Sequence, residues 1–224
     1  MRDLVTILFM LLSFVLSAQN KKTIFYDSAG QVTTWEGHWA QVVTGRFKSV
    51  YNKSENKKTL ERMTKEEFEV ELKKTEKRIT KTHKPGTSFP EFEVYDIDGN
   101  KLTKTELTGK VVVLNFWFIG CAPCEMERSA LNDLTKIYTS NEDVVFLSFA
   151  QNDKNQLTGF LKDHPILYQV VPTDKNYIKL TFKIDEYPTN IIIDKEGNYF
   201  FNSSASGVGI MTILRKQIDK ALER

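Results

Sequence analysis

The chain has 224 residues, of which 41% are hydrophobic and 12% aromatic, and its formal net charge at pH 7 is +2. This composition excludes an intrinsically disordered chain, because it contains enough apolar side chains to form a core. The near-balanced charge gives no reason to expect nucleic acid as a partner, and the length fits one domain with an extension or two small domains.

The N-terminal residues have the pattern of an export signal. An apolar-rich run extends from Leu4 to Leu16 and is followed by the small residues Ser17 and Ala18. The run is short for a bilayer span and has the length of a signal-peptide core. We therefore expect residues 1–18 to be a cleaved signal peptide, with an uncleaved anchor helix as the alternative. A cleaved signal predicts a periplasmic or otherwise extracytoplasmic protein, in a compartment where disulfides persist.

Residues 19–84 are expected to form an N-terminal extension of unknown role, with strands followed by a helix. Thr64 and Glu67 have the spacing of a capping box, which predicts a helix that runs to about Lys81. The apolar stripe of this helix is narrow, so it either packs against another element or is partly free. The strand-like segments are 23–26, 41–43 and 47–51, and 52–58 is predicted as a loop.

A segment with several prolines and glycines, His83 to Pro90, predicts a linker into a second domain at 85–224. In this domain strands alternate with helices, which predicts an α/β fold with a central mixed sheet flanked by helices on both faces. Strands are expected at 92–95, 101–102, 110–116, 143–150, 166–171, 190–193 and 198–201, and helices at about 121–139, 155–162, 174–182 and 210–222.

The only two cysteines, Cys121 and Cys124, follow a strand that is apolar enough to be buried on both faces. They lie in the first turn of a predicted helix, with Pro123 at an early position that lacks no hydrogen bond. The partial positive charge of a helix N-terminus favours a thiolate, which is the reactive form of cysteine. We expect Cys121 to be the more exposed thiol, which attacks a partner disulfide, and Cys124 to be the more buried resolving thiol.

Two other interpretations of the cysteine pair are weighed against redox exchange. A zinc site needs two further ligands, and His38, His83 and His164 are scattered and are interpreted as surface histidines. A structural disulfide between residues three positions apart closes almost no loop and so contributes little stability. We therefore favour a redox pair that needs neither a metal nor a cofactor.

A proline near the end of the domain is a second candidate feature. Tyr187-Pro188 precedes an apolar strand, and a cis peptide bond there would let the Tyr187 backbone pair with an extended substrate segment. From these residues alone, an ordinary trans turn proline is the favoured interpretation.

Two stretches resemble the thioredoxin superfamily. KVVVLNFWFIGCAPC is similar to the strand, turn and helix of that fold, and YPTNIIIDKEGNYFF is similar to its cis-proline strand and the hairpin that follows. The chain resembles more closely the TlpA/ResA-like extracytoplasmic thiol–disulfide oxidoreductases. Three features are common to both: a domain that begins with a sequence resembling F-x-V-x-D-x-x-G, an asparagine in the LNFW strand, and an extra strand-helix unit between the cysteine pair and the proline. The resemblance covers about Pro85 to Arg224 and implies a thioredoxin-like fold.

The resemblance also implies roles for individual residues. Cys121 and Cys124 would form the redox-active disulfide, Pro188 would be the cis-proline, and Trp117 and Tyr187 would contact the substrate together with Pro188. Three departures weaken any transfer of substrate identity: Gly120 replaces a common aromatic before the first cysteine, Ser129 replaces a frequent helix proline, and the residue before Pro188 is a bulky tyrosine.

Glu127 is the candidate proton acceptor. Thioredoxins carry a buried acid on the strand before the cysteines, where this chain has Asn115, which cannot ionise. The resemblance implies that a glutamate three residues after the second cysteine lies near the thiols instead, and an i to i+3 spacing puts Glu127 on the helix face of Cys124. The alternative is that Glu127 only counters the helix dipole, which suffices as an explanation for Glu125.

We therefore expect an exported enzyme that reduces disulfides in protein substrates and contributes to cell redox homeostasis. A membrane thiol reductase is the expected electron donor. The preference for reduction rests on the two nearby acids, Glu125 and Glu127, which disfavour a stabilised thiolate. The alternatives are an envelope protein-binding module on a thioredoxin-like platform and a thiol peroxidase.

Overall fold

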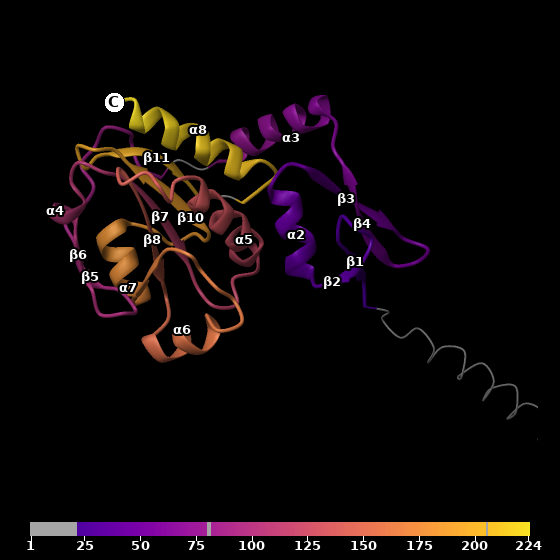
Figure 1. Cartoon of the computed structure of the whole chain (residues 1–224), viewed down its shortest axis with the longest axis horizontal. Coiled ribbons are helices and arrows are strands. Elements are labelled where there is room, and N and C mark those ends of the chain that lie inside the picture. The colour runs from indigo at the N-terminus through magenta and orange to yellow at the C-terminus, as the bar shows by residue number, and fades with distance from the viewer. Residues whose placement is uncertain (1–21, 80–81, 205) are drawn as a thin grey trace, which may run out of the picture.

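The computed structural model describes residues 22–79, 82–204 and 206–224. The expected signal peptide, 1–18, lies outside these described residues. Figure 1 shows a small unit, formed by the N-terminal part of the chain, beside a larger α/β unit. Among the described residues, the model contains no helix with both the length and the apolar character that a membrane span requires.

The smaller unit is a four-stranded sheet with two helices. Its strand order is β2-β1-β4-β3, with β1 parallel to β4 and the other neighbours antiparallel. Thr64 and Glu67 form the predicted capping box at the start of helix α3, so that prediction is confirmed. The elements are β1 (Ile24–Tyr26), β2 (Val32–Thr33), α2 (Trp35–Val43), β3 (Phe47–Asn52), β4 (Lys57–Arg62) and α3 (Lys65–Arg78).

Two predictions for the smaller unit are wrong, and one of its strands was not predicted. The segment 41–43 belongs to helix α2, which Thr34 caps by accepting the Gly37 N–H, and is not a strand. The polar strand β4 was not predicted, because its pairing with β3 and β1 forms only in the folded sheet. His38 is fully buried, with its ring nitrogens 2.7 Å from the Tyr26 carbonyl oxygen and 2.8 Å from Ser49 Oγ, so it is not a surface histidine.

The larger unit confirms the predicted mixed sheet flanked by helices. The strand order is β11-β10-β7-β8-β9, in which β7, β8 and β9 are parallel and β10 is antiparallel to both its neighbours. All seven residues of β7 are buried, as expected for a central strand. The strands are β7 (Val111–Trp117), β8 (Val144–Ala150), β9 (Gln169–Pro172), β10 (Thr189–Ile193) and β11 (Tyr199–Ser203).

Helices cover this sheet, and a hairpin, β5 (Glu93–Tyr95) with β6 (Lys101–Thr103), precedes it. One apolar cluster packs the hairpin and the helical segment around Phe182 against the sheet, and a second packs α5 and α8 against it. The short helix α4 was not predicted. The helices are α4 (Lys104–Leu107), α5 (Ala122–Ile137), α6 (Lys154–Phe160), α7 (Lys175–Tyr177) with a π-helical continuation (Ile178–Phe182), and α8 (Ile210–Leu222).

The two units contact each other through helices. Helix α2 lies against α5, and α3 lies beside α8 (Figure 1). The buried Thr75 hydroxyl of α3 donates a hydrogen bond of 2.8 Å to the Val208 carbonyl in the loop before α8. Gly209 of this loop approaches α3 so closely that an added Cβ atom would lie 2.7 Å from a Leu72 methyl carbon. The narrow apolar stripe of α3 is therefore packed against the larger unit.

We expect Thr75→Val to lower the free energy of unfolding by about 1–3 kcal/mol, because the Val208 carbonyl then loses its buried donor. Thr75→Ser is the matched control, since it keeps the hydroxyl. Urea unfolding of both variants measures the difference. Equal stabilities of the two variants would contradict an anchoring role for this hydrogen bond.

Candidate active site

The cysteine pair lies where strand β7 turns into helix α5. β7 ends at Trp117, and Gly120 adopts a φ of 90°, in the left-handed region that glycine enters without strain. Cys121 is the N-cap residue of α5, and Pro123 occupies one of the first two helical positions. This arrangement places both sulfur-bearing residues at the positive end of the α5 dipole, as the sequence predicts.

Cys121 and Cys124 form a disulfide, with their Cα atoms 5.2 Å apart. Both residues are buried, with exposed fractions of 4% for Cys121 and 6% for Cys124. The expectation that Cys121 is clearly more exposed is therefore wrong for this oxidised form. The physical reason is that the side chains of Phe118, Ile119 and Tyr187 pack against the same apolar cluster that contains the disulfide.

The loop before the cysteines is held by the neighbouring strand. The Ile119 N–H donates to Asn152 Oδ1 at 2.9 Å, and the Gln151 N–H donates to the Trp117 carbonyl at 3.0 Å. Trp117, a predicted substrate contact, is only 2% exposed. Burial leaves its ring no access to a partner protein, so the structure places Trp117 in the support of the loop and not on the contact surface.

Pro188 lies beside this loop because of the strand register. Thr189 of β10 pairs with Phe116 of β7, so Pro188 is one residue beyond the ladder, at the level of Trp117. The Tyr187-Pro188 peptide bond is cis, as the family resemblance implied. The Tyr187 ring is partly exposed and meets the Phe118 ring edge to face, with centroids 5.5 Å apart. The structure thus packs Tyr187 against the apolar cluster that contains the disulfide, whereas its neighbour Pro188 is buried.

Glu127 is fully buried one helical turn after Cys124. One oxygen of its carboxyl group accepts a hydrogen bond of 2.9 Å from the side-chain amide of Asn190, and the amide oxygen of Asn190 accepts one of 2.9 Å from Asn115. The two asparagines face each other across the β7–β10 ladder. They form a neutral chain of hydrogen bonds that ends at the carboxyl group.

Burial raises the pKa of Glu127 to about 7, against the weaker lowering effect of the hydrogen bond from the Asn190 amide. Among the described residues, the second carboxyl oxygen of Glu127 has no hydrogen-bond partner, and Ser206 Oγ is also buried without one. The Tyr168 hydroxyl is a third buried oxygen without a hydrogen-bond partner in the described part of the chain. Its pKa is raised mainly by burial and to a lesser extent by the charge of Glu127. A carboxyl group in this environment can take up or release a proton near neutral pH.

Glu125 has a different environment from Glu127 on the same helix. Its carboxylate forms an ion pair with Arg128, with 3.0 Å between Oε2 and Nε, and lies 3.5 Å from Nδ1 of His164. The imidazole of His164 stacks on Phe160 with a centroid distance of 4.3 Å. The charge of Glu125 is therefore compensated by a neighbouring cation, and the helix dipole is not its only partner.

Asn190 is a site residue that the sequence reasoning missed. The sequence places it in a strand and suggests no further role. The signal that could have found it is a lone amide side chain in the buried strand TNIII, because a buried amide needs a hydrogen-bond partner. Within the described residues, no group of three or more His, Cys, Asp or Glu side chains is arranged to hold a metal ion.

Comparison with known proteins agrees with this geometry. The sequence profile of the AhpC/TSA family matches residues 85–198, which is just over half of the chain. A thioredoxin-like protein of Bacillus subtilis, YneN, is 27% identical over 140 residues, or 62% of this chain and 78% of YneN. The thiol-disulfide oxidoreductase ResA of Bacillus cereus is 31% identical over 112 residues, or 50% of this chain; the match spans 65% of ResA, slightly less than two thirds.

Among solved structures, a thiol:disulfide interchange protein of the thioredoxin family from Chlorobium tepidum is similar in fold. The superposition has a TM-score of 0.53 with 22% sequence identity, and it covers 63% of this chain and 99% of the other. At this level of identity the likeness supports the thioredoxin-like fold of the larger unit.

The raised pKa of Glu127 predicts a pH dependence of stability. A carboxyl group whose pKa is higher in the folded than in the unfolded protein stabilises the fold below the unfolded pKa, and this contribution is lost as the pH rises through the folded value. Between pH 4.5 and pH 8 the oxidised protein should therefore lose about 3 kcal/mol relative to Glu127→Gln, which stays neutral. Urea unfolding at pH 4.5 and pH 8 measures this difference, and parallel pH profiles of the two proteins would refute it.

Proposed function

The chain belongs to the AhpC/TSA family, and from this premise we propose that it is a thiol–disulfide oxidoreductase that reduces disulfides of protein substrates outside the cytoplasm. The observation that carries the proposal is the Cys121–Cys124 disulfide at the N-terminus of α5, with the buried Glu127 one turn further along the helix. The name of the relative ResA agrees with this chemistry.

The reaction is a dithiol exchange. In the reduced protein, the Cys121 thiolate attacks one sulfur of the substrate disulfide, and the other substrate sulfur leaves as a thiolate that takes up a proton. The Cys124 thiolate then attacks the Cys121 sulfur of the mixed disulfide and releases the second substrate thiolate. Two electrons and two protons pass to the substrate, and the protein is left with the disulfide between Cys121 and Cys124.

We assign Glu127 as the base for the second attack. Cys124 is a poor nucleophile until its thiol loses a proton, and a carboxyl group on the same helix face with a pKa of about 7 can accept that proton. The Asn190 amide donates to the carboxyl group and so orients it. Because the amides of Asn190 and Asn115 are neutral, they supply no counter-charge that would keep Glu127 ionised throughout the cycle.

The direction of reaction follows from the charges around the thiols. An uncompensated carboxylate disfavours a thiolate, and an oxidoreductase whose thiolate is not stabilised is a weak oxidant and a better reductant. Glu127 exerts this effect without a cation, whereas Glu125 is paired with Arg128. A reductant outside the cytoplasm needs a thiol donor, and a membrane thiol reductase is the class of protein that could provide it.

The cysteine roles predict which variant is trapped on a substrate. Reduced Cys124→Ser should accumulate a mixed disulfide with insulin, because no thiol remains to resolve it, whereas Cys121→Ser should give little. Non-reducing electrophoresis measures the adduct. Equal adducts in the two variants would contradict the division of roles, and consumption of peroxide without insulin reduction would point to a peroxidase.

The base assignment predicts a change in the pH profile. Glu127→Gln should slow insulin reduction at pH 7 by about 10²-fold or more, the usual contribution of a general base. The deficit should shrink as the pH rises, because solvent then deprotonates Cys124. The control is Glu125→Gln, which makes the same change on the same helix. Asn190→Asp is not a suitable control because it adds a charge. An unchanged rate–pH profile in Glu127→Gln would eliminate Glu127 as the base.

A further inference from the structure

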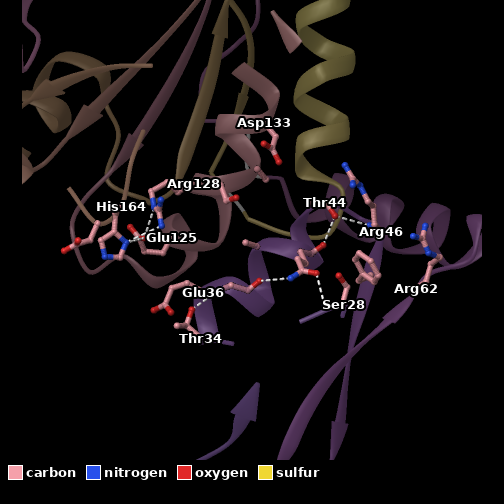
Figure 2. A pocket seen from close by; sticks show the side chains of 17 residues that line it. Ser28, Thr34, Glu36, Thr44, Arg46, Arg62, Glu125, Arg128, Asp133 and His164 are labelled. Carbon is pink, nitrogen blue, oxygen red and sulfur yellow. Dashed lines mark hydrogen bonds and ion pairs between the residues drawn. The ribbon is translucent and has the colours of Figure 1, made fainter. Parts of the chain in front are cut away.

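The N-terminal unit and the redox helix enclose a cleft that the dithiol chemistry does not use. The cleft has a volume of about 670 Å³ (Figure 2). One wall comes from α2, Thr44, Arg46 and Arg62, and the other from α5 and the His164 loop. Glu125, which directly follows Cys124 in the chain, lines one part of the cleft, and neither cysteine is among the lining residues.

A smaller cavity of about 230 Å³ extends the cleft along α5. The two cavities have Thr44, Arg46, Ala130 and Asp133 in common, and the second continues to Ile137 and to Arg215 of α8. From Glu125 to Ile137 the helix rises about 18 Å, the length of five or six residues of extended chain. The dimensions fit a stretch of polypeptide better than a compact small molecule.

The charges of the cleft are unevenly compensated. Glu125 is paired with Arg128, and Asp133 is paired with Lys136. By contrast, neither the exposed Arg46 nor the exposed Arg62 forms an ion pair within the described part of the chain. Figure 2 shows these two arginines on the side of the cleft away from Glu125 and His164. Unpaired guanidinium groups are well suited to bind carboxylates.

Two acidic residues of the cleft qualify this pattern. Asp163 adjoins His164 in the same loop, and Glu36 lies in the first turn of α2, where it complements the helix dipole. Both belong to the part of the cleft away from Arg46 and Arg62. The cleft therefore has an acidic end and an end with two arginines. A segment with its carboxylate far from the disulfide fits this polarity, and a uniformly acidic or basic segment does not.

We propose that this cleft binds an extended segment of the disulfide-bearing polypeptide through a carboxylate about four to six residues from the reacting cysteine, and that the N-terminal unit thereby selects the substrate. The inference rests on the proposed function. It gives residues 22–79 a role as a recognition surface.

Binding can be tested without any redox step. The probes are fluorescent twelve-residue peptides with serine in place of cysteine, carrying two aspartates or two lysines four to six residues from that serine. Fluorescence anisotropy with the full oxidised chain should show about tenfold tighter binding of the aspartate peptide, and 0.5 M NaCl should weaken it. The double variant Arg46→Glu/Arg62→Glu should abolish the preference. Lys53→Glu/Lys77→Glu, an equal change of charge at exposed residues of the same unit outside the cleft, should keep it.

Kinetics separates failure of this inference from failure of the proposed function. With cysteine-containing versions of the peptides as mixed disulfides, Arg46→Glu/Arg62→Glu should raise KM about tenfold for the aspartate peptide and leave kcat unchanged. Reduction of bis(2-hydroxyethyl) disulfide, which is too small to reach the arginines, should not change. Equal binding of the two peptides, or loss of the preference in the lysine control, would overturn the inference even if the small disulfide is reduced. Failure to reduce any disulfide would overturn the proposed function, while anisotropy would still decide whether the cleft binds the acidic peptide.

Discussion

Thr189 of β10 lies opposite Phe116 of β7, and the next pair along the ladder is Asn190 with Asn115. The candidate site depends on this antiparallel register. A shift of one residue would turn the Asn190 side chain to the other face of the sheet, away from Asn115 and Glu127. The same register sets Pro188 at the level of the loop before Cys121. One set of backbone hydrogen bonds therefore fixes both the position of Pro188 and the contact of Asn190 with Glu127.

Two glutamates of helix α5 lie in opposite electrostatic environments. Glu125 is 9% exposed and is paired with Arg128, whereas Glu127 is fully buried and accepts its hydrogen bond from the neutral amide of Asn190. Burial without a counter-charge raises the pKa of Glu127 to about 7, where both protonation states are accessible. In the described part of the chain, one oxygen of Glu127 and the hydroxyl oxygens of Ser206 and Tyr168 are buried without hydrogen-bond partners, which costs stability.

The N-terminal unit is positioned to influence this chemistry from outside the thioredoxin-like fold. Its helix α2 lies against the redox helix α5, and its helix α3 holds the loop that leads into α8 through Thr75. Ser206, whose buried hydroxyl has no hydrogen-bond partner among the described residues, belongs to the same loop region. The unit thus contacts the larger one through α5 and through α8, and Glu125, the residue after Cys124, lines the cleft between them.

The sequence by itself determined the redox pair, its place at a helix N-terminus and the mixed sheet, because these features depend on apolar runs and the C-x-x-C spacing. Glu127 became the candidate base through the resemblance to the TlpA/ResA-like proteins, with which the i to i+3 spacing agrees. Tertiary structure decided the rest. The burial of Cys121 and Trp117, the contact of Asn190 with Glu127 and the pairing of Glu125 with Arg128 arise from packing and strand register. The cleft, finally, exists only because residues 22–79 fold against α5, an arrangement that no local pattern in the chain encodes.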